Sequence, residues 1–194
     1  MIILRKDKLN LVEPENEVMH KAPQPFNFEA DGNSAQNIAN VLFERMKQLG
    51  GVGLSANQVG LDMRVFVMGV SETKIAVFNP IIIKYSNTEE LFNEGCLSYP
   101  GIMLAINRPT KITATYQDET GKFIEQEFNG LTARIFQHEY DHMNGTDFTG
   151  RVSKFKLDYA KKKFENKRKK IIKKYAVKTM IEALNGNKDS NWIW

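Results

Sequence analysis

Cysteine is nearly absent from this sequence, and long apolar runs are missing. Cys96 is the only cysteine, which excludes an intramolecular disulfide and is typical of a protein from a reducing compartment. No apolar run approaches the roughly 18 residues that a membrane-spanning helix needs. Residues 1–6 form too short an apolar segment for a signal peptide, and no small-residue cleavage site follows them. We therefore expect a cytoplasmic protein with no membrane segment and no disulfide partner.

Basic residues gather toward the C-terminal end. Residues 151–178 contain 13 lysines and arginines against two acids, although the net charge of the whole chain is only +4. The other residues are therefore net acidic. A length of 194 residues suffices for one well-buried domain and is short for two. We expect a catalytic domain over residues 1–150, with a basic helix and tail over residues 151–194 that pack on it or extend from it.

The pattern of apolar residues predicts an α+β fold. Apolar residues recur at helical spacing up to Leu49, which predicts a helix that begins after Ser34 as N-cap. Helices are also predicted over residues 131–144 and 157–184. Strands are predicted, with a break at Asn79–Pro80, over residues 64–70, 75–78, 81–85, 102–106, 111–116 and 122–128. This order favours mostly antiparallel sheets around the central helix 131–144, followed by a C-terminal helix.

The central helix carries the pattern H-E-x-x-H at His138-Glu139-Tyr140-Asp141-His142. Residues four apart lie on one face of a helix, so the two imidazoles can bind one metal ion. Glu139 lies beside that metal and can accept a proton from a water molecule on it. A five-residue pattern can arise by chance, but two of the three histidines in the chain have this spacing. We therefore favour a metal site.

Two other stretches contribute candidate residues. A catalytic metal site of this kind needs a third protein ligand and an open position for water. Cys96 is the candidate ligand, although a lone cysteine is more often a small buried hydrophobe. Gln58 lies in a glycine-rich stretch and can donate a hydrogen bond to developing negative charge. That stretch lacks the Lys-Ser/Thr ending of a P-loop, which argues against a phosphate site.

Three blocks of this sequence resemble the blocks of the peptide deformylase family. Residues 51–58 are similar to the family's Gly-φ-Gly-φ-Ala-Ala-x-Gln, where φ is an apolar residue. Residues 94–98 read Glu-Gly-Cys-Leu-Ser, and residues 137–142 match Gln-His-Glu-φ-Asp-His. The resemblance implies a metal-dependent hydrolase of protein biosynthesis that removes the formyl group of formyl-methionine from nascent polypeptides and releases formate. It also implies a cytoplasmic location, with an organelle as the alternative.

The resemblance implies a role for each matched position in catalysis. Cys96, His138 and His142 would bind one divalent metal, iron(II) in the cell and zinc, nickel or cobalt in purified protein. Glu139 would act as general base and then as general acid.

Further positions would hold the substrate or support the site. Gln58 and the backbone N–H of Leu97 would bind the formyl oxygen, and Glu94 and Arg108 would form an ion pair that braces the cysteine loop. Gly53 would pair through its backbone with the extended peptide. The expected substrate-binding residues are Val52, Gly53, Leu131 and Ile135.

This chain departs from the family pattern at three positions. Ser55 stands where alanine is usual, and Met103 stands where some members have an arginine near the substrate backbone. Arg134 takes a position at the rim of the site that is apolar in some subgroups. The catalytic residues are unaffected by these departures.

Two other interpretations remain open from the sequence. One is a zinc peptidase of the general H-E-x-x-H kind, with Glu165 or Glu182 as the third ligand. The other is a nucleic-acid or ribosome-binding module that uses the basic segment 151–178, although lysine-covered helices are usually only solvated. Both ribosome contact and catalysis could also belong to one protein. The tail with Trp192 and Trp194 would need a partner surface.

Overall fold

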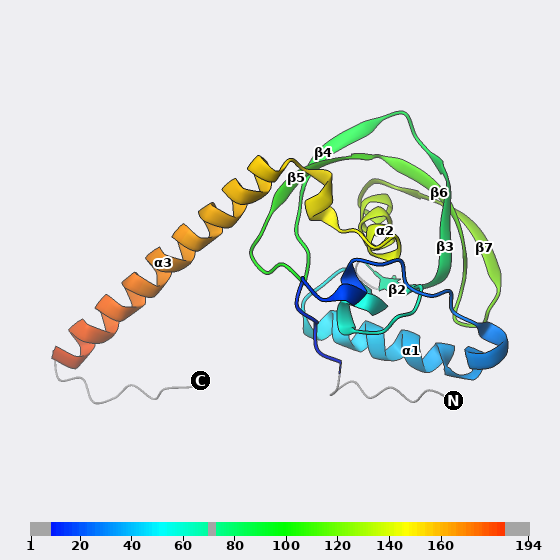
Figure 1. Ribbon diagram of the computed structural model, residues 1–194, viewed down its shortest axis with the longest axis horizontal. Helices are drawn as coiled ribbons and strands as arrows, with labels where there is room; N and C mark the ends of the chain where they lie inside the picture. Colours follow the sequence, from blue (N-terminus) through cyan, green and yellow to red (C-terminus); the bar gives the residue numbers. More distant parts are fainter. Residues whose placement is uncertain (1–8, 70–72, 185–194) are drawn as a thin grey trace. The chain divides into compact units, whose positions relative to one another are not determined.

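The computed structural model describes residues 9–69 and 73–184 (Figure 1). Trp192 and Trp194 therefore lie outside the described residues. Contacts along the chain divide it into two units, Met1–Ser153 and Lys154–Trp194. The assignment of catalysis to residues 1–150 and of a basic extension to residues 151–194 stays a prediction. Among the described helices, none combines the length and the apolar character needed to cross a membrane.

The first unit alternates between helices and antiparallel strands. Its described elements are η2 (Glu17–Met19), α1 (Phe28–Gln48), β1 (Gly53–Ser55), η3 (Ala56–Val59), β2 (Val65–Met68), β3 (Ile75–Tyr85), β4 (Glu89–Glu94), β5 (Leu104–Pro109), β6 (Lys111–Gln117), β7 (Phe123–Asn129), α2 (Gly130–Met143) and η4 (Phe148–Arg151). The second unit contains α3 (Lys154–Leu184).

Two sheets surround the helix that carries the H-E-x-x-H pattern. One sheet has five antiparallel strands in the order β1-β2-β3-β6-β7, and the other is the antiparallel pair β4-β5. Helix α2 lies inside the curve of these strands in Figure 1. The predicted α+β fold with a central helix and a C-terminal helix is confirmed.

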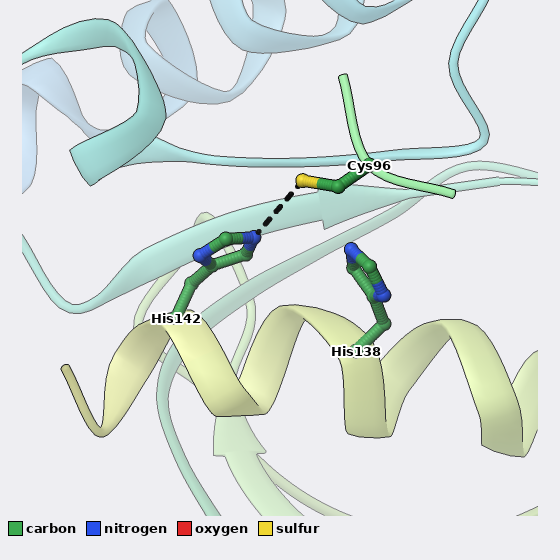
Figure 2. Close-up of side chains that lie close together, drawn as sticks. All are labelled: Cys96, His138 and His142. Atoms are coloured by element: carbon green, nitrogen blue, oxygen red, sulfur yellow. Dashed lines mark hydrogen bonds between the residues drawn. The ribbon is translucent and has the colours of Figure 1, made fainter. Parts of the chain in front are cut away.

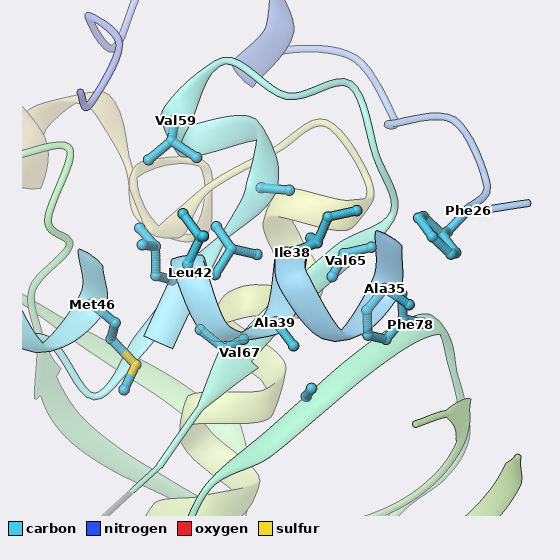
Figure 3. Close-up of a cluster of buried hydrophobic side chains, with 14 of the residues drawn as sticks. Phe26, Ala35, Ile38, Ala39, Leu42, Met46, Val59, Val65, Val67 and Phe78 are labelled. Carbon is cyan, nitrogen blue, oxygen red and sulfur yellow. The ribbon is translucent and has the colours of Figure 1, made fainter. Parts of the chain in front are cut away.

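Strand β2 shows why the chain folds in layers. Successive side chains of a strand point to opposite faces of the sheet. Val65 and Val67 accordingly join the core that α1 covers, shown in Figure 3. Phe66 and Met68 join the second core, in which Phe136 of α2 packs. Helix α2 therefore packs on one face of the sheet, and α1 packs on the opposite face.

The start of α1 differs from the prediction. The helix begins at Phe28, and the side chain of Asn27 accepts hydrogen bonds from backbone N–H groups of its first turn. Ser34 lies inside the helix, where its hydroxyl donates to the carbonyl of Asp31. The prediction of Ser34 as N-cap is wrong. The preceding Asp-Gly-Asn resembles a turn, which made a helix start at Ser34 plausible. Asn27 instead caps the helix farther upstream.

The strands around the site also differ in their bounds. The predicted break at Asn79–Pro80 is wrong, because β3 continues through it with a register shift between Phe78 and Ile81. Asn79 adopts a φ of 50°, which asparagine tolerates better than most residues, and so absorbs the irregularity. Strand β4 is missing from the prediction because five of its six residues are exposed, so it lacks an alternating pattern.

Candidate metal centre and catalytic pocket

Three side chains that can each offer a ligand atom meet in the first unit. The ligand atoms of Cys96, His138 and His142 all lie within 4.8 Å of one another. Figure 2 shows the two histidines on one side of α2, with Cys96 facing them from the loop after β4. The Cys96 Sγ atom is 3.5 Å from Nε2 of His142. The structure thus brings together the three ligands that the sequence predicted from distant blocks.

Glu94 determines which nitrogen of His138 faces the cluster. Nδ1 of His138 lies 3.2 Å from a carboxylate oxygen of Glu94, so Nε2 remains available as a ligand. Burial lowers the pKa of His138, but hydrogen bonds to Cys96 and Glu94 outweigh it and raise that pKa to about 10. Burial and the nearby charge of His138 lower the pKa of His142 to about 3, which keeps it neutral. A metal ion at Nε2 of His138 would compete with a proton for that nitrogen.

The Glu94 carboxylate is held by two arginines. Nε and Nη2 of Arg108 donate to its two oxygens over 2.7 and 2.8 Å, and Nη1 of Arg134 donates over 2.7 Å. Burial raises the pKa of Glu94, but hydrogen bonds from His138, Arg108 and Arg134 lower it to about 2. The predicted ion pair of Glu94 and Arg108 is therefore present. Arg134 was expected at the rim, but it is buried beside this pair.

A second carboxylate extends the network to the end of the first unit. Nη1 of Arg108 donates to Asp141 of α2 over 2.9 Å, and Arg151 of η4 donates to both oxygens of the same carboxylate. No role for Asp141 or Arg151 was predicted from the sequence. Asp141 could have been found, because it lies within the Gln-His-Glu-φ-Asp-His block, whereas no local pattern marks Arg151.

Glu139 has the environment of a general base. Its side chain is buried, and its Oε2 atom has no hydrogen-bond partner among the described residues. Burial raises the pKa of Glu139 to about 7, although the charge of His138 lowers it. A Cβ atom added at Gly53 would lie 2.3 Å from Oε1 of Glu139, so only glycine leaves room for this carboxylate. A carboxyl group with a pKa near 7 can both accept and return a proton at neutral pH.

The amide of Gln58 is oriented with its donor toward the cluster. Its Oε1 atom accepts from the backbone N–H and the hydroxyl of Ser55 over 3.0 and 3.1 Å. This leaves Nε2 pointing toward Cys96 Sγ at 3.3 Å and Ser98 Oγ at 3.0 Å. Ser55 stands where the resembled family usually has alanine. Its hydroxyl therefore helps to hold the Nε2 donor of Gln58 beside the candidate metal ligands.

These groups open into one pocket of about 670 Å³. Its lining includes Gln58, Leu97, Cys96, His138 and Glu139. It also includes every predicted substrate-binding residue, namely Val52, Gly53, Leu131 and Ile135. The candidate catalytic groups and the predicted substrate-binding residues therefore line the same pocket.

The cluster fits a divalent transition metal. One thiolate and two imidazoles are a donor set that suits zinc or iron(II). The unpartnered Oε2 atom of Glu139 is available to a water molecule at such a metal. The arrangement can therefore support hydrolysis of an amide, in which a base, a hydrogen-bond donor and a metal act on one carbonyl.

Comparisons with known proteins agree with this chemistry. Residues 8–158 match the polypeptide deformylase family. A peptide deformylase from Thermotoga maritima is 40% identical over 146 residues, which cover 75% of this chain and 88% of that protein. Its crystal structure aligns with a TM-score of 0.70 and 36% identity, over 75% of this chain and 97% of that one. A class I type b peptide deformylase from Acinetobacter baumannii, solved with Met-Ala-Ser bound, aligns with a TM-score of 0.71 and 27% identity, over 74% of this chain and 98% of that one.

Replacing Arg108 with methionine should strongly destabilise the protein. The change leaves Glu94 and Asp141 without their shared buried cation, and breaking a buried ion pair typically costs about 3–5 kcal/mol. Urea unfolding of the metal-free protein measures the loss. Lys111→Met is the control, because Lys111 pairs with Glu127 over 3.8 Å with both side chains mostly exposed, and such pairs contribute about 1 kcal/mol or less. Equal losses in the two variants would contradict the central place given to Arg108.

Proposed function

This chain belongs to the peptide deformylase family, metal-dependent hydrolases that remove the N-formyl group from nascent polypeptides, and we propose which of its residues perform each part of that reaction. The proposal is carried by one observation. The unpartnered carboxylate of Glu139 and the amide donor of Gln58 line the same pocket as the three candidate ligands.

We assign the metal to Cys96, His138 and His142. A divalent ion held there would supply Lewis acidity, which can lower the pKa of a ligated water to ~7. We propose iron(II) in the cell, with zinc, nickel or cobalt as substitutes in purified protein. This choice is supported by the mixed donor set of one soft sulfur and two nitrogens.

Glu139 is the residue that moves the proton. It accepts a proton from the attacking water, whose oxygen forms a bond to the formyl carbon. It then returns the proton to the nitrogen of methionine as the carbon–nitrogen bond breaks, so the products are formate and a free amine. Its raised pKa supports both transfers, since neither state of the carboxyl group is strongly favoured at neutral pH.

Gln58 and Leu97 stabilise the negative charge that develops on the formyl oxygen. The side-chain N–H of Gln58 already points toward the ligand cluster, and Leu97 places a backbone N–H directly after Cys96 in the chain. One such donor typically contributes about 10²–10³ in rate. Glu94 and Arg108 hold His138 and the cysteine loop in place and take no part in proton transfer.

The methionine side chain occupies the apolar wall formed by Val52, Leu131 and Ile135. Gly53 offers its backbone to the extended peptide, which would add to the edge of β1 as a strand. The Acinetobacter baumannii relative with Met-Ala-Ser bound supports a peptide with N-terminal methionine as the ligand. We place the enzyme in the cytoplasm, or in an organelle that makes its own formylated proteins.

Replacing Glu139 with glutamine should lower formate release from a formyl-methionine peptide by at least ~100-fold, because a positioned base contributes about 10²–10⁴. Metal content per chain should stay unchanged, since Glu139 is not among the assigned ligands. Glu127→Gln, an exposed carboxylate of β7, is the matched control and should keep full activity. A Glu139→Gln enzyme with normal turnover would exclude the assigned role, and cleavage of internal peptide bonds would favour the peptidase interpretation.

Gly53→Ala should slow the same reaction by ~100-fold or more without unfolding the protein. The new Cβ would lie 2.3 to 3.0 Å from Oε1, Cδ and Cγ of Glu139, so this side chain must shift and the base is then misplaced. A double-mutant cycle tests this cause. The variant that combines Gly53→Ala with Glu139→Gln should be no slower than Glu139→Gln alone. A further large loss in the combined variant would mean that Gly53 acts through peptide pairing instead.

A contact with the ribosome is the second proposal, and the composition of α3 supports it. Every lysine of α3 whose side chain the structure describes is exposed, and most of α3 falls within the strongly basic segment 151–178. Binding to ribosomal RNA through such charges would weaken steeply with salt.

Reversal of Lys162, Lys169 and Lys173 to glutamate should abolish co-sedimentation with ribosomes at low salt and spare turnover of short peptides. The control reverses three exposed lysines of the first unit, Lys84, Lys111 and Lys122. Unchanged co-sedimentation of the α3 variant would end this proposal.

A further inference from the structure

The loop that carries Cys96 is attached to the rest of the first unit at both ends. It runs over residues 95–103, between β4 and β5. On its N-terminal side, Glu94 accepts hydrogen bonds from two buried arginines. On its C-terminal side, the hydroxyl of Tyr99 donates to Oδ2 of Asp147 over 2.7 Å. Tyr99 and Asp147 both lie outside the three sequence blocks of the family resemblance, and neither takes part in the catalytic steps.

The hydrogen bond between Tyr99 and Asp147 is charge-assisted. Asp147 is buried, with 5% of its surface exposed. Burial raises the pKa of Asp147, but hydrogen bonds from Thr149 and Tyr99 outweigh it and lower that pKa below its usual value. A hydroxyl that donates to an ionised carboxylate makes a shorter and stronger bond than one that donates to a neutral acceptor. The bond is therefore strong enough to restrain a loop.

Asp147 is held in place by its own contacts. Its Oδ1 atom accepts from the backbone N–H and the hydroxyl of Thr149 over 2.8 and 2.6 Å, and it thereby caps η4. Farther along η4, Arg151 donates to Asp141 of α2. One oxygen of Asp147 therefore caps η4, and the other accepts from Tyr99. Through η4, the loop is connected to the helix that carries both histidines.

A buried aromatic ring links the same attachment to His138. The ring of Phe148, which is fully buried, lies 5.5 Å from the ring of Tyr99 and 5.7 Å from that of His138, measured between centroids. Aromatic rings at these separations attract each other beyond the burial of their area. A shift of Tyr99 would therefore change the packing around His138 as well as the position of its own loop.

We propose that Tyr99 and Asp147 are positioning residues of the metal centre. Their hydrogen bond holds the loop of Cys96 against the two histidines of α2. The restraint reaches the candidate ligand through the backbone, because the N–H of Tyr99 donates to the carbonyl of Cys96 over 3.0 Å. A pre-formed cluster has less chain entropy to lose on binding, so it binds more tightly. The inference rests on the proposed function, in particular on the assignment of the metal to these three ligands.

The test measures the affinity of the full chain for cobalt(II), after removal of bound metal and without substrate. Cobalt(II) accepts imidazole and thiolate ligands, and its absorption spectrum shows whether a thiolate is bound. Tyr99→Phe removes one hydroxyl and keeps the ring beside Phe148. It should raise the Kd for cobalt(II) by at least ~10-fold, since loss of a residue that orients a ligand typically costs about 10- to 100-fold in metal affinity.

Two changes at Asp147 separate the hydrogen bond from the charge. Asp147→Ser keeps a hydroxyl that can cap η4 but leaves no second oxygen for Tyr99, so it should weaken cobalt(II) binding as Tyr99→Phe does. Asp147→Asn removes the charge and keeps the contact, because its amide N–H can donate to the hydroxyl of Tyr99. This variant should bind cobalt(II) nearly as tightly as the unchanged protein. The protein with both Tyr99→Phe and Asp147→Ser should bind no more weakly than either single variant.

Tyr116→Phe is the matched control. The hydroxyl of Tyr116 donates to Gln126 over 2.8 Å in the same unit, and neither residue is among those that line the pocket. Like Tyr99→Phe, the control should lower the urea midpoint of the metal-free protein, but it should leave the Kd for cobalt(II) unchanged.

The outcomes distinguish the positioning role from the metal assignment. Equal Kd values for Tyr99→Phe and Tyr116→Phe would overturn the positioning role, and so would an Asp147→Asn protein that binds as weakly as Asp147→Ser. A cobalt(II) spectrum of the unchanged protein without a thiolate band would instead overturn the metal assignment on which the proposed function rests.

Discussion

The ion pair between Glu94 and Arg108 is the interaction on which the geometry of the candidate metal centre depends. Both side chains are buried, so neither charge would be tolerated there without the other. Because Glu94 also bonds Nδ1 of His138, the pair fixes which nitrogen faces Cys96. Arg108 continues to Asp141 on the same helix, so the strands β4-β5 and α2 are tied at two points. The geometry of the three candidate ligands is thus supported by residues outside the cluster.

Two buried carboxylates of this site show how partners, rather than burial alone, decide ionisation. Glu94 accepts hydrogen bonds from two arginines, and its pKa falls to about 2. Glu139 lacks a partner at Oε2, and its pKa rises to about 7. Burial raises both pKa values, but at Glu94 the hydrogen bonds from His138, Arg108 and Arg134 and the charge of Arg108 outweigh it. Two glutamates of one pocket therefore have pKa values on opposite sides of the ordinary glutamate value.

The sequence predicted those features that depend on local spacing. His138 and His142 could be paired because residues four apart share a helix face. That Cys96 reaches them depends on how the loop after β4 folds, so from its residue type Cys96 was only a candidate, which the resemblance to a known family then supported. The positions of Arg134 and Arg151 could not be predicted, because their carboxylate partners come from other elements. Strand β4 was not predicted because most of its residues are exposed, so apolar and polar residues do not alternate along it.

The arrangement separates chemistry from recognition. Every arginine that lines or braces the pocket bonds a carboxylate of the protein itself, and so the surface left for substrate is largely apolar. Binding energy then comes from burial of apolar side chains, which is not directional. The two groups proposed to act at the reacting bond are each placed by a neighbour. Gly53 leaves room for the carboxylate of Glu139, and Ser55 donates hydrogen bonds to Gln58. Under the proposed function, such an apolar surface would accept side chains of different shape, while Glu139 and Gln58 act on one amide.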